Sequence, residues 1–277
     1  MNITLKTESE IDMIRESSLL VSRTLGMISE EIKPGVITLT LDKLAEQFIQ
    51  DNGGIPAFKN YKSSPDSDPF PYTLCVSLNE EVVHGFPGKD KILQEGDIVS
   101  IDCGVLKNGF YGDSAFTFPV GQITPEKELL LQTTRESLYE GIQKAIAGNR
   151  IGDVGYAIQH FVESKGYSVV VEMVGHGVGV KLHEPPEVPN YGKKGQGVLL
   201  KEGMVIAIEP MINMGKRHIR QAKDGWTIYT ADRNPSAHFE HTIVVRKQKA
   251  EVLSSFEFIK EEFCRNTSSL QPQIVDE

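Results

Sequence analysis

LQEGDIVSID, residues 93–102, and LKEGMVIAIE, residues 200–209, are two versions of one pattern in the same chain. Each contains a Glu-Gly turn, continues as an apolar strand-like run and ends in a carboxylate, Asp102 in the first and Glu209 in the second. Internal self-similarity of this kind indicates a duplicated unit. The alternative is a chance resemblance between two turn-and-strand units. If the duplication is real, a pseudo-two-fold axis brings the two carboxylate strands together.

The order of the surrounding elements also repeats, which favours duplication. Each half is predicted to begin with a long helix and a shorter one and to continue with strands. In the first half, the long helix is predicted from the capping box Thr7–Glu10 to Lys33-Pro34-Gly35. The shorter helix carries Leu41, Leu44, Ala45 and Phe48 and ends at Asn52-Gly53-Gly54. The strands of this half cover 98–103 and 110–120. In the second half the helices run from Thr124-Pro125 to Gly148 and from a cap at Asp153 to Gly166, and the strands lie near 168–174, 205–212, 226–229 and 241–245.

We therefore predict an α/β (α+β) fold made of two duplicated helix-helix-strand halves around a central antiparallel sheet. One domain is expected over residues 1–253, with halves of about 1–120 and 121–253. Residues 254–277 would form a C-terminal extension. Phe256, Ile259 and Phe263 are spaced for one face of a short helix, and the last dozen residues are predicted to be disordered.

Bulk composition narrows the class of protein. The 277 residues carry a net charge of −9, which argues against nucleic acid as a main partner because phosphate binding needs a basic surface. Three cysteines suit a reducing compartment better than a disulfide framework. The amino-terminal segment does not resemble a signal peptide, and no apolar run approaches the roughly 20 residues that span a bilayer. We expect a cytoplasmic, monomeric protein without a membrane partner.

Carboxylates occur at unusual places in the predicted strands. If Asn108-Gly109 forms a two-residue hairpin, Lys107 pairs with Phe110, and Asp102 and Asp113 lie diagonally on one face. Two surface aspartates would be the simpler interpretation, but Asp102 follows an apolar run. Glu209 likewise ends an apolar strand, and Glu240 precedes another. Four buried negative charges need about four positive ones, and no lysine or arginine in these runs supplies them. Two divalent metal ions would.

His176 in the run Gly175-His176-Gly177-Val178-Gly179 is the predicted fifth ligand. The glycines permit close backbone approach, and the spacing does not match the G-x-G-x-x-G pattern of nucleotide binding. A lone histidine is more often a structural hydrogen-bonding residue, so this assignment depends on the four carboxylates. One nitrogen with several oxygens suits manganese, iron(II), cobalt or magnesium better than a closed thiolate zinc site. Two such ions about 3.5–4 Å apart can share a hydroxide and polarise a carbonyl.

Together these segments resemble one enzyme family. NEEVVHG (79–85), DIVSID (97–102), GFYGDS (109–114), GHGVGVKLHEP (175–185), IEPM (208–211) and EHTIVV (240–245) are similar, in order and spacing, to type I methionine aminopeptidases of the bacterial kind. The likeness covers roughly residues 5 to 253. It implies the "pita-bread" fold and removal of the initiator methionine from nascent chains whose second residue is small. The ribosome is the partner that such a substrate implies.

The resemblance also implies a role for each matching residue. Asp113 and Glu240 would bridge the two ions, Asp102 would chelate one, and His176 and Glu209 would hold the other. A bridging hydroxide would attack the scissile carbonyl while Glu209 moves the proton. His84 and His183 would flank the substrate, with His183 stabilising the tetrahedral intermediate; core histidines are the alternative. The methionine side chain would contact Cys75 and Trp226, with Phe58, Tyr61, Phe70 and Met211 as neighbours. Residues of each of these types are more often plain core.

The chain departs from the family pattern in two places near this pocket. Residues 62–69 lengthen the loop before Cys75, and Leu182 stands where an aromatic residue is usual. Two alternative functions are weighed. A proline-directed peptidase of the same fold would need an additional domain and additional histidines around the site. A non-catalytic pita-bread binding protein would have lost metal ligands, whereas all five are present.

Overall fold

The first half of the chain folds as two helices followed by a long hairpin. The computed structural model describes residues 3–264. The elements of this half are α1 (Glu8–Ser29), α2 (Thr38–Asp51), β1 (Ile55–Pro56), β2 (Leu74–Leu78), β3 (Glu81–Val83), β4 (Ile98–Lys107) and β5 (Phe110–Pro119). The Thr7–Glu10 capping box starts α1 as predicted. The helix ends at Ser29, earlier than expected, and single turns lead to Gly35.

The second half repeats two helices and then divides its strands into shorter pieces. Its elements are α3 (Pro125–Ile142), α4 (Ile151–Ser164), β6 (Ser168–Val169), β7 (Gly175–Gly177), β8 (Glu184–Val188), β9 (Val205–Ile208), β10 (Met211–Asn213), β11 (Ile219–Gln221), β12 (Ile228–Thr230), β13 (Ser236–His238), β14 (His241–Val244), β15 (Glu251–Val252) and α5 (Glu261–Cys264).

Two helix predictions in this half were wrong at their ends. The helix predicted to reach Gly148 ends at Ile142, because Ala147 and Gly148 donate their amides to distant carbonyls, those of Arg246 and Leu200. Asp153 does not cap α4 from outside. It occupies the first turn, where its carboxylate accepts the amides of Arg150 at 2.8 Å and Gly195 at 2.7 Å. Tertiary hydrogen bonds therefore set both boundaries.

Three strand predictions also needed correction. The strand predicted over 205–212 is interrupted at Glu209-Pro210, and the two pieces, β9 and β10, join different sheets. The segment 226–229 becomes a strand only at Ile228, because the Asp224 side chain accepts the amides of Trp226 and Thr227 in a turn. The segment 168–174 contributes only β6 and then leaves the sheet.

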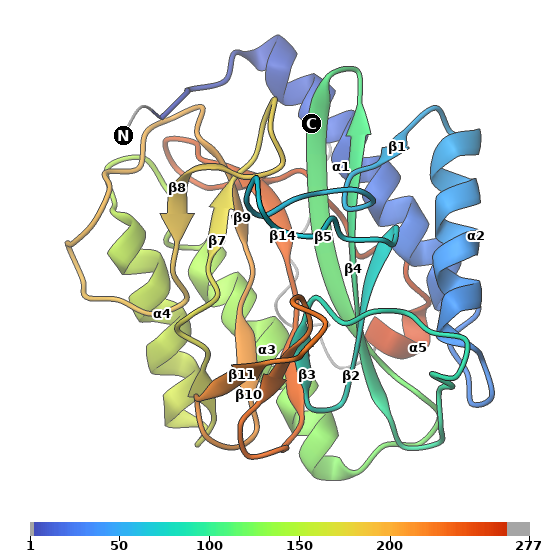
Figure 1. Ribbon diagram of the computed structural model, residues 1–277. Helices are drawn as coiled ribbons and strands as arrows, with labels where there is room; N and C mark the ends of the chain where they lie inside the picture. Colours follow the sequence, from blue (N-terminus) through green and yellow to red (C-terminus); the bar gives the residue numbers. More distant parts are fainter. Residues whose placement is uncertain (1–2, 265–277) are drawn as a thin grey trace.

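The predicted central antiparallel sheet is realised as two antiparallel sheets that meet edge to edge. One contains β1, β4, β2 and β5, with Lys107 opposite Phe110 as the hairpin motif predicted. The other has the order β15-β14-β9-β7-β8. Figure 1 shows β5 and β14 side by side at the centre, with α1 and α2 behind one half and α3 and α4 behind the other.

Side-chain hydroxyls join β5 to the segment that runs from β13 into β14; we call this junction the seam. The Glu240 amide donates to the Ala115 carbonyl at 2.9 Å. Ser114 donates to the Glu240 carbonyl at 2.7 Å, and Thr117 donates to the His238 carbonyl at 2.7 Å. Thr242 donates to the Asp113 carbonyl at 2.8 Å. The seam therefore fixes how the two halves meet.

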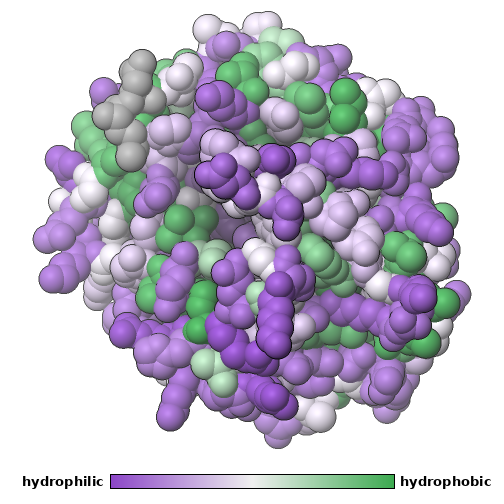
Figure 2. Space-filling model, in the orientation of Figure 1, coloured by the Kyte–Doolittle hydropathy of each residue, from purple (hydrophilic) through white to green (hydrophobic). Residues whose placement is uncertain are grey.

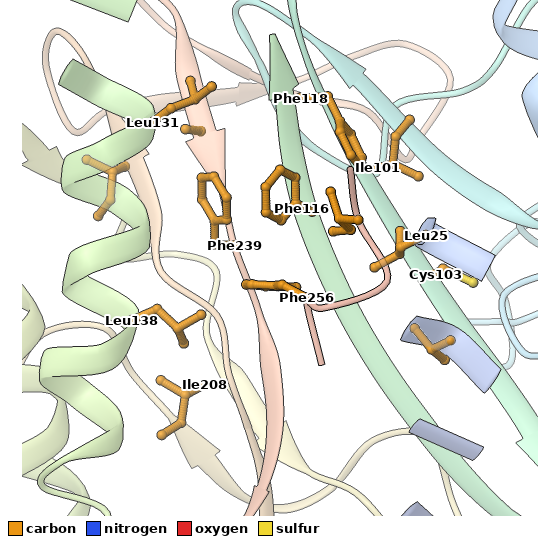
Figure 3. Packing of buried hydrophobic residues seen from close by; sticks show 14 of the residues in the cluster. Leu25, Ile101, Cys103, Phe116, Phe118, Leu131, Leu138, Ile208, Phe239 and Phe256 are labelled. Carbon is orange, nitrogen blue, oxygen red and sulfur yellow. The ribbon is translucent and has the colours of Figure 1, made fainter. Parts of the chain in front are cut away.

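Aromatic side chains fill the core behind the seam. Phe116 contacts Phe239 and Phe256 with ring centroids 4.8 and 4.9 Å apart, in edge-to-face arrangements (Figure 3). Phe256 and Ile259 are buried in this core, but both precede α5. Of the three residues predicted to share one helical face, only Phe263 lies in a helix. The domain boundary at 253 stays a prediction, and the segment predicted to be disordered lies outside the described residues. Over residues 3–264, none of the helices is long and apolar enough to span a membrane.

A buried ion pair ties the amino-terminal segment to the loop that carries His183. Lys6 Nζ lies 2.6 Å from Glu184 Oε2, with 3% and 11% of the two side chains exposed, and Glu184 Oε1 also accepts the Lys181 amide. We expect Lys6→Met to lower the free energy of unfolding by about 3–5 kcal/mol, because it leaves a buried carboxylate without its cation. Urea unfolding measures this. The double variant Lys6→Met/Glu184→Gln should lose clearly less; an equal loss would contradict the charge argument.

Candidate metal centre and substrate pocket

Five predicted metal ligands from both halves of the chain line one cavity of about 250 Å³. Asp102 lies on β4 and Asp113 on β5, while His176 lies on β7. Glu209 follows β9, where the Asn190 side chain donates to its carbonyl at 2.9 Å, and Glu240 precedes β14 at the seam. The molecular face in Figure 2 is mainly hydrophilic and is hollowed near its centre.

The ligand atoms are close together. Nε2 of His176 lies 3.8 Å from Asp113 Oδ2 and 3.5 Å from Glu209 Oε1. Ligand atoms of Asp113, His176 and Glu240 all lie within 4.8 Å of one another. His176 Nδ1 is 3.0 Å from the Gly177 carbonyl, so Nδ1 is the donor and Nε2 of the neutral ring keeps its lone pair toward the carboxylates. That tautomer is the one that ligates a metal.

Burial makes this cluster of acids costly without cations. It raises the pKa of Asp102 to about 7. Burial, reinforced by neighbouring carboxylates, raises the pKa values of Asp113, Glu209 and Glu240 well above the ordinary range. Burial lowers the pKa of His176 to about 4, which keeps its imidazole neutral. A nearby cation would reverse the shifts of the acids.

The donor set fits divalent metal ions on structural grounds. Asp102 Oδ1, Asp113 Oδ1 and Glu240 Oε1 are fully buried and have no hydrogen-bond partner among the described residues. Buried carboxylate oxygens are normally paired, and bound cations would supply the partners that these three oxygens need. Carboxylate oxygens with a neutral imidazole are ligands that manganese, iron(II) and cobalt accept.

The two histidines predicted to flank the substrate also line the cavity. His84 has a φ of 59°, a backbone conformation uncommon for residues other than glycine, and burial lowers its pKa to about 4. His183 also lines the cavity, with its Nδ1 2.6 Å from the Tyr61 hydroxyl and its ring centroid 4.2 Å from that of His176. Tyr61 therefore orients the His183 ring, and Nε2 stays available for other contacts.

An apolar recess adjoins the ligands and contains every residue predicted for the methionine pocket. Cys75 pairs with Asp102 across β2 and β4, so both side chains lie on the cavity face of the sheet. Phe70 meets Trp226 edge to face at 5.3 Å. Leu182 packs among the same groups. The pocket residues that line the cavity are Phe58, Tyr61, Phe70, Cys75, Met211 and Trp226.

Sequence reasoning missed several residues around this cavity. Ser63, Val83, Met173 and Val174 also line it, and Ser63 belongs to the lengthened loop 62–69. The Trp226 indole donates to the Asp68 carbonyl at 3.2 Å, which holds this loop over the pocket. His238, behind Glu209, was also missed. Residues two apart in an extended segment face the same side, so its spacing from Glu240 was the available signal.

Comparison with known proteins assigns the class. Residues 12–247 match the model of metallopeptidase family M24, and the chain belongs to that family. It is 48% identical over 252 residues to the methionine aminopeptidase of Clostridium perfringens, covering 91% of this chain and 98% of the relative. The methionine aminopeptidase structure from Thermotoga maritima matches with a TM-score of 0.88 at 42% identity, over 92% of this chain and 100% of that one. The chain thus groups with the methionine aminopeptidases of the family.

The predicted fold is confirmed by the same comparisons. The chain has the pita-bread fold of these proteins. A prolidase from Pyrococcus furiosus shares that fold, with a TM-score of 0.74 at 23% identity, and the match covers 91% of this chain and 66% of the prolidase. That likeness concerns the fold alone.

Proposed function

We propose that the chain removes the N-terminal methionine from nascent proteins and peptides whose second residue is small, with two divalent ions bound. One observation carries this proposal: the five-ligand cluster and an apolar, sulfur-containing recess open into the same cavity. The first suits hydrolysis, and the second suits a thioether side chain. Manganese, iron(II) or cobalt are the proposed ions.

The ligands divide into shared and single-ion donors. Asp113 and Glu240, one from each side of the seam, would serve both ions. Asp102 would hold one ion, and His176 with Glu209 the other. When bound, such ions polarise a carbonyl oxygen and make water more acidic.

The protein's own residues would position the substrate and move the proton. Glu209 takes the proton of the water molecule that attacks the scissile carbonyl and returns it to the departing amine. Its carboxylate is placed for this because it lies beside the other predicted ligands and lines the cavity. His183, fixed by Tyr61, donates to the oxygen of the scissile peptide group and stabilises the tetrahedral intermediate. His84 lines the same cavity and contacts the substrate beside the scissile bond.

Aromatic and sulfur groups would select methionine at the first position. The recess has edge-to-face ring pairs at Phe70 that leave little freedom for the wall to move. An unbranched thioether fits such a space better than a side chain branched at Cγ.

A peptide panel tests the proposal. We expect kcat/KM for Met-Ala-Ser to exceed that for Leu-Ala-Ser by about 10–200-fold, the range that small changes of apolar shape produce. Amine release from both peptides is measured with each candidate metal. Equal rates would indicate a broader aminopeptidase. Preferred cleavage of Ala-Pro-Ser would favour the proline-directed alternative, and no cleavage of any peptide would favour the binding protein. Cytoplasmic location, a monomeric state and action at the ribosome stay predictions from sequence.

A further inference from the structure

His238 is a buried imidazole behind the Glu209 carboxylate. It ends β13, pairs with Met211 of β10 and is 2% exposed. Its Nε2 is shielded from solvent and has no hydrogen-bond partner among the described residues. A buried polar atom without a partner is uncommon in a folded protein and points to an interaction made when the site is working.

Hydrogen bonds to a buried threonine hydroxyl fix the backbone that carries this ring. The His238 amide donates to Thr117 Oγ1 at 2.9 Å, and that hydroxyl donates back to the His238 carbonyl at 2.7 Å. Thr117 is itself 2.8 Å from the Ser100 hydroxyl. Both threonine and serine are buried in the hairpin β4–β5. The backbone that carries the imidazole is therefore attached to the first half of the chain although it belongs to the second.

Glu209 lies between two imidazoles. Its Oε1 is 3.5 Å from Nε2 of His176, and its Oε2 is 3.8 Å from Nε2 of His238. His238 is not part of the ligand group formed by Asp113, His176 and Glu240. It therefore faces the oxygen that is turned away from His176. Hydrogen bonds at catalytic sites are often long before substrate binds and tighten in the complex, so 3.8 Å is within reach of a bond.

We propose that His238 is a positioning residue for Glu209, donating its Nε2–H to Oε2 and holding Oε1 toward the metal side of the cavity. This inference rests on the proposed function, because the proposed function assigns Glu209 to the metal ligands. Residues that orient a ligand through its second oxygen set its rotation and its readiness to bind. In this proposal His238 acts through Glu209.

The test compares two substitutions with the full-length wild-type protein. His238→Leu removes the donor and keeps an apolar group of moderate size. His238→Gln keeps an N–H donor. Calorimetric titration of the metal-free proteins with Mn²⁺ should show about 10–100-fold weaker binding for His238→Leu. Its kcat on Met-Ala-Ser should fall by about the same factor, with KM changed less than about 3-fold. His238→Gln should recover most of both losses.

Two results would overturn the assignment. One is wild-type Mn²⁺ affinity in His238→Leu. The other is equal loss in both variants while circular dichroism shows that both are folded, because that would implicate packing and not the donor. If even the wild type cleaves no methionine peptide, the proposed function fails, but the affinity comparison still decides whether His238 orients Glu209.

Discussion

Glu209→Gln is expected to lower kcat on Met-Ala-Ser by about 10²–10⁴-fold, the contribution typical of a positioned acid–base group. An amide cannot take up the proton released during attack, and it brings no negative charge to the metal site. The substitution preserves shape, and the side chain is only 13% exposed, so the fold should be retained. Steady-state kinetics with a circular dichroism spectrum measures both quantities.

Glu202→Gln is the matched control for this variant. Glu202 lies in the same repeat segment, seven residues earlier, but 46% of its side chain is exposed and its nearest cation, on Lys247, is 3.6 Å away. It should retain wild-type turnover. Full activity in Glu209→Gln would remove Glu209 from the mechanism, whatever the control shows.

Removal of divalent metals is expected to abolish turnover, and Mn²⁺, Co²⁺ or Fe²⁺ should restore it. Three buried carboxylate oxygens have no protein partner among the described residues, so the site depends on cations for its charge balance. The test measures turnover after dialysis against a chelator, with elemental analysis to verify metal removal, and again after readdition of each metal. Undiminished activity in thoroughly metal-free protein would exclude the two-metal proposal.

The stability of the same metal-free protein provides a second readout. Because burial raises the pKa of Asp102 from 3.8 to about 7, the folded state binds more protons than the unfolded state between those values. Stability from this group is present below pH 3.8 and is lost as pH rises through about 7. The other three acids have the same sign. Stabilisation by Mn²⁺, measured as a shift in melting temperature, should therefore be larger at pH 8 than at pH 5.

Much of the fold could be predicted because its signals are local. The capping box at Thr7 and the turn at Asn108-Gly109 depend on neighbouring residues, and both were found where expected. The interruption at Glu209-Pro210 had a local signal that was overlooked, because proline has no backbone N–H to donate within a sheet. That the two pieces join different sheets could be seen only in the structure. Similarly, α3 ends where Ala147 and Gly148 find partners in distant segments, which no local pattern records.

The candidate site was predictable to the extent that charge in apolar strands requires an explanation. Asp102 and Glu209 stood out for that reason, and the repeat explained why residues so far apart should share a cavity. His238 carried only a weak signal, its spacing of two residues from Glu240, and its unpartnered nitrogen beside Glu209 is evident only in the structure. Ser63 belongs to a lengthened loop whose path depends on a contact between Trp226 and Asp68.

The seam between the halves has a consequence for how metal affinity could evolve or be engineered. Asp113 and Glu240 stand on opposite sides of it, so the span between these carboxylates is set by how the halves are joined. The halves are joined by hydrogen bonds from the hydroxyls of Ser114, Thr117 and Thr242, and none of these residues belongs to the predicted ligand set. We expect that loss of one of these hydroxyls would change the distance between the two carboxylates without altering any predicted ligand. The affinity of the site for a cation would then depend on how the two halves are aligned, and residues that do not contact the cation could change it.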